Sequence, residues 1–307
     1  MKPVRKRLRW ALQLAVAGVV AWMVWAAIVG NWNEFRSLRV SLTPRPGWIA
    51  LSVLVIFLSY AISVEAWRRI LDGWAQHLAY GRAARIWLVA NLGRYIPGKV
   101  WSVAGLIVLA QRAGVAPWAA GASAFAIQAV AIGTAVVLVA AATPGAASPL
   151  RLGAAAVVAV ATIALLAWDR GVRGVARLMG STAPIQPLPV AAVAKSAGLG
   201  LLAWMAHGAA FWLLARGLGL PDTLSVVTAA GVFPLGYILG LLALFAPGGL
   251  GVREVVLIGL LAPALGWGGA VALSVASRIL LTVTEVVAPL GVLLVTRHGK
   301  EDMNVRT

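Results

Sequence analysis

Long apolar runs separated by short polar loops dominate the pattern of this chain. A helix needs about 20 mostly apolar residues to cross the hydrocarbon core of a bilayer, and several runs reach that length. The pattern therefore predicts an all-α membrane protein. Full-length helices are expected at residues 10–29, 48–70, 117–142, 150–168, 190–215 and 268–296.

Two further apolar stretches are interrupted. Residues 84–111 break at "YIPGKVW", and residues 224–261 break at "FAPGGLGVREV". Proline removes a backbone donor and clashes with the preceding turn, so each Pro-Gly pair is expected to end a helix. The predicted fold class is an all-α polytopic membrane protein with about six full crossings and two broken, re-entrant helical elements, or eight crossings if each broken element counts as one.

The N-terminal apolar run follows a basic segment, as in a secretory signal peptide. It is longer than a typical signal-peptide core, and no convincing small-residue cleavage site follows it. We interpret residues 1–30 as an extra, retained N-terminal helix.

Composition agrees with a membrane protein and argues against a soluble one. The chain is 61% hydrophobic and only 11% charged, whereas about a quarter of residues are charged in a soluble domain. The net charge of +17 lies mostly in short loops, with no soluble basic domain to bind nucleic acid. The absence of cysteine excludes disulfides and thiolate chemistry. We expect residues 1–307 to form a single transmembrane domain.

Lysine and arginine set the expected orientation. If the N-terminus is cytoplasmic and each broken element returns to its side of entry, most loop cations fall inside, as the positive-inside rule requires. If each broken element crossed once, Arg170, Arg173 and Arg177 would move outside, although residues 224–245 are long enough to cross alone. We expect a multi-pass protein of the cytoplasmic membrane, with both termini and the tail 297–307 in the cytoplasm.

The two halves of the chain resemble each other. Residues 48–168 and 190–296 each contain a helix, a broken element and a further helix. The breaks occupy matching positions, at Pro97-Gly98 and Pro247-Gly248. Re-entrant breaks would make the repeats inverted, and broken helices at matching positions of inverted repeats mark the binding site in many transporters. The alternative is that the two Pro-Gly pairs match by coincidence, because the sequence identity between the halves is faint.

The second break has the residues for anion binding. Gly248, Gly249 and Gly251 permit unusual dihedrals, and the half-helix that follows would direct free N–H groups into a polar cavity. Arg253 lies in its first turn, where a cation does not suit the helix dipole. An anionic ligand or a carboxylate partner would explain it.

The first break is also basic. Arg94 and Lys99 flank it, beside Tyr95 and Trp101. Two cationic breaks that face one cavity would hold a phosphate or diphosphate headgroup. The two aromatic residues would line that cavity or anchor the protein at the membrane interface.

The last helix carries Arg278 and Glu285, seven residues apart and so roughly on one face. Intramembrane charges are usually paired and functional. They would line a substrate path, or Arg278 would pair with Glu254 or Glu285 and hold helices together. Weaker candidates are Asn91, Gln128 and Glu65, and His207 as a packed polar residue or a proton relay.

Several chemistries have no motif here. The sequence contains no P-loop and no metal-binding spacing such as HExxH. Its nine acidic residues are scattered, without a carboxylate pair in a membrane-facing loop. We expect no cofactor, no metal and no enzymatic activity.

"APGGLGVREVVLIGLL", followed by a Gly-rich turn and "ASRILLTVTE", resembles the lysylphosphatidylglycerol synthase transmembrane family of flippase-like proteins. "NLGRYIPGKVW" is similar to the family's first-half motif. The resemblance implies binding roles for the matching residues, and lipid translocation without the soluble aminoacyl-transferase domain. Many members continue the first motif with Gly-Glu and an arginine, where this chain has Trp101, Ser102 and Gly105. The matching residues are Asn91, Pro97, Gly98, Lys99, Pro247, Gly248, Gly249, Gly251, Arg253, Glu254 and Arg278.

These observations favour a transporter that moves an anionic phospholipid or polyprenyl-phosphate-linked lipid between leaflets. The expected partners are membrane lipids with anionic headgroups, and a homo-oligomer or a partner from envelope biosynthesis. One alternative is a non-catalytic scaffold in envelope glycan or lipid assembly. The other is a membrane enzyme that acts on lipid-linked substrates.

Overall fold

The computed structural model describes residues 42–96, 100–142, 149–168, 186–242 and 251–304. Over these ranges the chain forms α-helices and one 3₁₀ turn, and no strand. Four helices are long and apolar enough to span a membrane: Pro46–Gly73, Pro117–Ala142, Val190–Gly217 and Val252–Leu293. The all-helical membrane class is thus confirmed, while the helix expected at 10–29 lies outside the described residues.

The uninterrupted helices agree closely with the sequence pattern. They are α2 (Pro46–Gly73), α5 (Pro117–Ala142), α6 (Pro149–Ala167) and α8 (Val190–Gly217). Proline stands in the first turn of the first three and immediately before the fourth. It fits there because the first N–H groups of a helix have no intrahelical acceptor.

The first broken element is a helical hairpin. It consists of α3 (Tyr80–Asn91), the 3₁₀ turn η1 (Leu92–Tyr95) and α4 (Trp101–Arg112), and α3 packs against α4. The loops at its two ends meet, because the Ala116 amide donates a hydrogen bond to Gln76 Oε1 at 3.0 Å. The element therefore returns to the end of the bundle at which it started.

The second broken element has the same form. It pairs α9 (Val226–Leu242) with the first arm of α10 (Val252–Asn304). Gly266 kinks α10, with φ 70° and ψ 163°. The helix expected at 268–296 is the second arm of α10, which begins after this glycine, because Gly266 leaves helical geometry and divides the two arms. Thr223 Oγ1 donates to the Ala264 carbonyl at 2.5 Å and joins the two ends of this hairpin.

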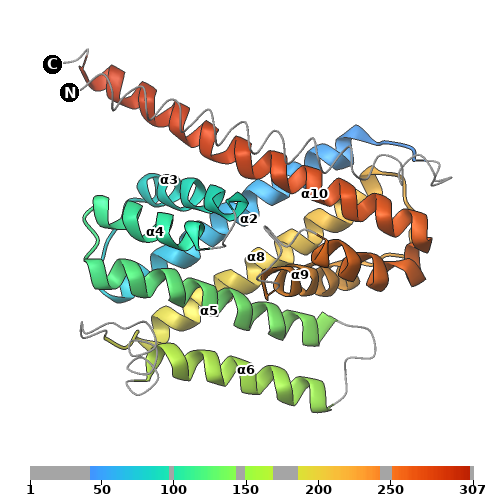
Figure 1. Cartoon of the computed structure of the whole chain (residues 1–307), viewed down its shortest axis with the longest axis horizontal. Helices are drawn as coiled ribbons and strands as arrows, with labels where there is room; N and C mark the ends of the chain where they lie inside the picture. The colour runs from blue at the N-terminus through green and yellow to red at the C-terminus, as the bar shows by residue number, and fades with distance from the viewer. Residues whose placement is uncertain (1–41, 97–99, 143–148, 169–185, 243–250, 305–307) are drawn as a thin grey trace.

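The helices α2 and α8 cross the centre of the bundle in opposite directions (Figure 1). The Arg45 amide before α2 donates to the Gly217 carbonyl at the end of α8, at 2.7 Å. At the other end, Trp74 Nε1 donates to the Gln186 carbonyl at 2.9 Å. The two hairpins consequently open at opposite ends of the bundle. This arrangement is the one expected of inverted repeats, while the repeat bounds and the number of membrane crossings stay predictions.

The buried apolar residues form two clusters, one around each hairpin. Trp67 and Ile70 of α2 belong to the first, and Leu257 and Leu261 of α10 belong to the second. Both α2 and α8 contribute to both clusters. The space between the clusters is the part of the interior in which polar side chains gather.

Candidate functional site

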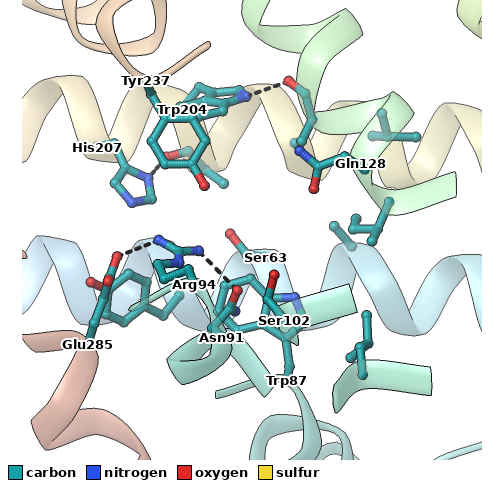
Figure 2. Close-up of a pocket in the computed structure, with 18 of the residues that line it drawn as sticks. Ser63, Trp87, Asn91, Arg94, Ser102, Gln128, Trp204, His207, Tyr237 and Glu285 are labelled. Atoms are coloured by element: carbon teal, nitrogen blue, oxygen red, sulfur yellow. Dashed lines mark hydrogen bonds and ion pairs between the residues drawn. The ribbon is translucent and has the colours of Figure 1, made fainter. Parts of the chain in front are cut away.

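Two adjoining cavities of about 150 and about 110 Å³ lie where the tip of the first hairpin meets α8, α9 and α10. Figure 2 shows the larger one, with polar side chains projecting into it from several helices. Each break of the chain supplies an arginine to the smaller cavity, Arg94 from η1 and Arg253 from α10. The residues shared by the two linings are Asn91, Arg94, Ser102, Gln128, Tyr237, Leu281 and Glu285.

Glu285 holds the tip of the first hairpin. Its Oε1 accepts a hydrogen bond from Arg94 Nη1 at 2.6 Å, and its Oε2 accepts one from the Tyr95 hydroxyl at 2.5 Å. Arg94 Nη2 also donates to Asn91 Oδ1 at 2.9 Å (Figure 2). The first break is thus joined to the second arm of α10 by one carboxylate with two donors.

The start of α10 has its own charge pair. Gly251 has φ 82°, and its amide donates to Glu254 Oε2 at 2.8 Å. A glutamate that returns to the amide before the first helical turn forms half of a capping box. Glu254 Oε1 also lies 3.6 Å from Arg278 Nη1. The predicted pairing of Arg278 with Glu254 is confirmed.

Arg253 differs from the other two cavity arginines. It is 6% exposed, and its Nη2 has no hydrogen-bond partner. The guanidinium carbon lies 4.8 Å from the centre of the Phe233 ring, a cation–π contact worth about 1–2 kcal/mol. The described lining of the smaller cavity contains three guanidinium groups and the carboxylate of Glu285. Even with Glu254, which pairs with Arg278, positive charge is in excess.

Aromatic residues form the other walls of the larger cavity. Trp204, His207 and Tyr237 project toward it from α8 and α9 (Figure 2). His207 Nδ1 lies 2.9 Å from the Ala203 carbonyl, Nε2 lies 3.2 Å from Ser59 Oγ, and the ring stacks on Phe233. These contacts favour the interpretation of His207 as a packed polar residue.

The structure brings together most of the predicted site residues that it describes. Tyr95 is buried and bonded to Glu285, so the anchor interpretation is wrong for it. Trp101 is 50% exposed and lines neither cavity, as an anchor would. Glu65 pairs with Arg68 and Arg69 away from the cavities. Six predicted residues lie outside the described part of the chain: Pro97, Gly98, Lys99, Pro247, Gly248 and Gly249.

The sequence patterns missed the aromatic walls. Tyr60, Trp87, Trp204, Phe233 and Tyr237 line the larger cavity. They lie within apolar runs, where such residues also serve as lipid-facing or core positions. The hydroxyl of Tyr237 inside the otherwise apolar α9 was the one usable signal. No cluster of His, Asp and Glu able to hold a metal occurs in the described chain.

The motifs, the broken helices and the charged cavity agree with a comparison against known families. The model of the lysylphosphatidylglycerol synthase TM region matches residues 10–288. The chain belongs to this family. Membership confirms the resemblance found from the motifs and supports a membrane role related to lipids. No curated protein matches the chain.

Proposed function

We propose that this member of the family moves an anionic lipid between the leaflets of the cytoplasmic membrane. Arg94, Arg253 and Arg278 would bind the phosphate of the headgroup. The acyl chains would stay in the bilayer, because cavities of about 150 and about 110 Å³ suit a headgroup better than acyl chains. The end of the bundle that carries Arg68, Arg69, Arg82, Arg85, Arg112 and Lys195 would face the cytoplasm.

Arg253 carries this proposal. A charge taken out of water without a partner costs several kcal/mol in practice, roughly the scale of the whole stability of a domain. Glu254 and Glu285 are engaged by other groups, Glu254 by Gly251 and Arg278 and Glu285 by Arg94 and Tyr95. An incoming phosphate would supply an acceptor for Nη2 of Arg253 and neutralise the excess charge. Phosphate suits a guanidinium because both can form two parallel hydrogen bonds.

The engaged carboxylates also favour transport over lipid modification. General acid–base catalysis needs a carboxyl group within hydrogen-bond reach of the reacting proton and free to exchange it. Glu285 accepts from two donors, and Glu254 caps α10 and pairs with Arg278. We therefore propose a transporter rather than an enzyme.

One observation favours a scaffold as the second candidate. The Arg94–Glu285 pair joins η1 to the second arm of α10, and the Arg278–Glu254 pair joins the two arms of α10, so both would also hold a static bundle together. A scaffold has no need for a buried arginine whose Nη2 lacks a hydrogen-bond partner, as in Arg253. Substitution of Arg253 therefore separates the two functions.

The test is lipid exchange in liposomes that contain the purified protein. Acyl-labelled phosphatidylglycerol and phosphatidylcholine are followed by chemical quenching of the outer leaflet. We expect wild type to accelerate phosphatidylglycerol, Arg253→Gln to slow it by about tenfold or more because a charged hydrogen bond is lost, and the exposed control Arg45→Gln to match wild type. Exchange no faster than in empty liposomes would leave the scaffold as the better proposal.

A further inference from the structure

A second positively charged hollow lies on the outside of the first hairpin. It is a groove of about 640 Å³ between α3, the end of α4 and the second arm of α10. None of its lining residues lines the two internal cavities. Figure 1 shows α10 passing along α3 at this place. The groove is thus separate from the proposed transport site, with α3 and α4 between them.

Three arginines line the groove. Arg82 and Arg85 are three residues apart on α3 and therefore neighbours on one helix face, and Arg112 ends α4. All three are exposed, and no carboxylate belongs to the described lining. Three like charges in one hollow repel each other, so a bound anion would relieve the repulsion. Planar guanidinium groups bind phosphate through paired hydrogen bonds.

The remainder of the lining is apolar. Ile86 and Val89 of α3, Leu109 of α4, Ala113 just after α4 and Leu293 of α10 complete the surface. A free phosphate or nucleotide would gain no binding energy from contact with aliphatic side chains. A phospholipid uses both parts, because its phosphate lies beside the start of its acyl chains. Basic pockets between transmembrane helices on the cytoplasmic side are typical sites for anionic headgroups.

The groove also lies at the end of the first hairpin, where the headgroup of a lipid would be expected. Arg82 is in the first turn of α3 and Arg112 is the last residue of α4, at the same end of the hairpin. That end also carries Arg68, Arg69 and Lys195, and it is the end where the apolar helices meet polar loops. Headgroup phosphates lie at this boundary in a bilayer.

We infer that the groove between α3, α4 and α10 binds an anionic phospholipid, with its phosphate on Arg82, Arg85 and Arg112. The lipid would remain bound outside the hairpin whose tip carries Arg94. This site does not depend on the transport proposal, since it would stabilise the hairpin in a scaffold as well.

The test measures phosphatidylglycerol binding to the purified protein by native mass spectrometry. All variants carry Arg253→Gln, which disables the proposed internal site. The groove variant adds Arg82→Gln, Arg85→Gln and Arg112→Gln. The matched control adds Arg45→Gln, Arg69→Gln and Lys195→Gln, which remove the same charge from described positions outside the groove. A further variant, the Lys triple, carries Arg82→Lys, Arg85→Lys and Arg112→Lys in place of the Gln substitutions. It tests whether positive charge alone is sufficient for lipid binding.

We expect the groove variant to bind phosphatidylglycerol about tenfold or more weakly, because each cation near an anionic headgroup contributes several-fold to affinity. The control should bind as the parent does, and the Lys triple should lie between them. An unchanged melting temperature of the lipid-free protein would show that the groove variant is folded. Equal binding by groove and control variants would overturn the site, as would equal binding of phosphatidylcholine. Binding of soluble glycerol phosphate as tight as that of the lipid would overturn the lipid assignment.

Discussion

Glu285 is the residue on which two donors from the first hairpin converge. Glu285→Gln would leave the partly buried guanidinium of Arg94 without its counter-charge. Removing one partner of such a pair costs about 3–5 kcal/mol, so we expect a clear fall in the melting temperature in detergent. The double variant Glu285→Gln/Arg94→Gln should recover part of this loss, because no unpaired charge remains.

Tyr95→Phe is the matched control for that comparison. It removes one hydrogen bond to Glu285 but leaves the Arg94–Glu285 pair. Its cost should be smaller, about 1.5–3 kcal/mol for a hydrogen bond to a charged group. If the double variant is as unstable as Glu285→Gln alone, the residues are not coupled as an ion pair.

Arg253 is expected to lower the stability of the lipid-free protein and to contribute to lipid binding. Its guanidinium is buried and its Nη2 has no hydrogen-bond partner, so Arg253→Met removes a buried charge and keeps much of the contact with Phe233. Replacing buried charges with apolar groups is often stabilising by about 1–4 kcal/mol. We expect Arg253→Met to melt above wild type in detergent without lipid. Added phosphatidylglycerol should then raise the melting temperature of wild type more than that of the variant.

The control for this prediction is Arg216→Met. Arg216 pairs with Asp222 and contacts the Trp212 ring at the other end of the bundle. Its loss should leave stability unchanged or lower it slightly, because Asp222 is 88% exposed and an ion pair that water reaches contributes only about 0–1 kcal/mol. A lower melting temperature for Arg253→Met than for wild type would show that the guanidinium stabilises the lipid-free protein, against the transport proposal.

The kink of α10 depends on one backbone position. Gly266 has φ 70° and ψ 163°, a region open almost only to glycine, although nothing lies within 4 Å of the place its Cβ would take. Gly266→Ala should therefore destabilise the protein by about 1–3 kcal/mol through backbone strain alone. Thermal unfolding in detergent measures the loss.

Gly259 in the first arm of α10 provides the matched control. The same 4 Å of free space surrounds its Cβ position, but no positive φ is found there. Gly259→Ala should be neutral or stabilising by up to about 1 kcal/mol, because alanine is the better helix former. Equal effects of the two substitutions would mean that the kink does not require glycine.

The sequence predicted the elements better than it predicted the site. Helix ends and breaks depend on local chemistry, so Pro117 and the Pro-Gly pairs could be interpreted directly. The pairing of Arg94 with Glu285 joins residues 191 positions apart, and no spacing rule reaches that far. Tyr60 and Trp204 looked like ordinary apolar positions for the same reason. The charged site residues could be identified from the sequence, because an arginine inside an apolar run is costly in a membrane and usually functional.

At the scale of the whole molecule, the two hairpins open at opposite ends of the bundle. Asp222 precedes α9 near the ends of the second hairpin, and His77 precedes α3 near those of the first. Their side chains are 88% and 76% exposed. Inverted, re-entrant hairpins place these residues on opposite sides of the membrane.

Single cysteines test this arrangement cleanly, because the chain contains no cysteine of its own. We expect Asp222→Cys to react with a membrane-impermeant maleimide in intact cells, and His77→Cys to react only after permeabilisation. The direction follows from the basic end of the bundle facing the cytoplasm. The residue replaced in each variant is exposed and makes one ion pair, so each variant should fold. Labelling of both from the same side would mean that the first broken element, which lies between the two positions, crosses the membrane, and it would overturn the inverted repeat.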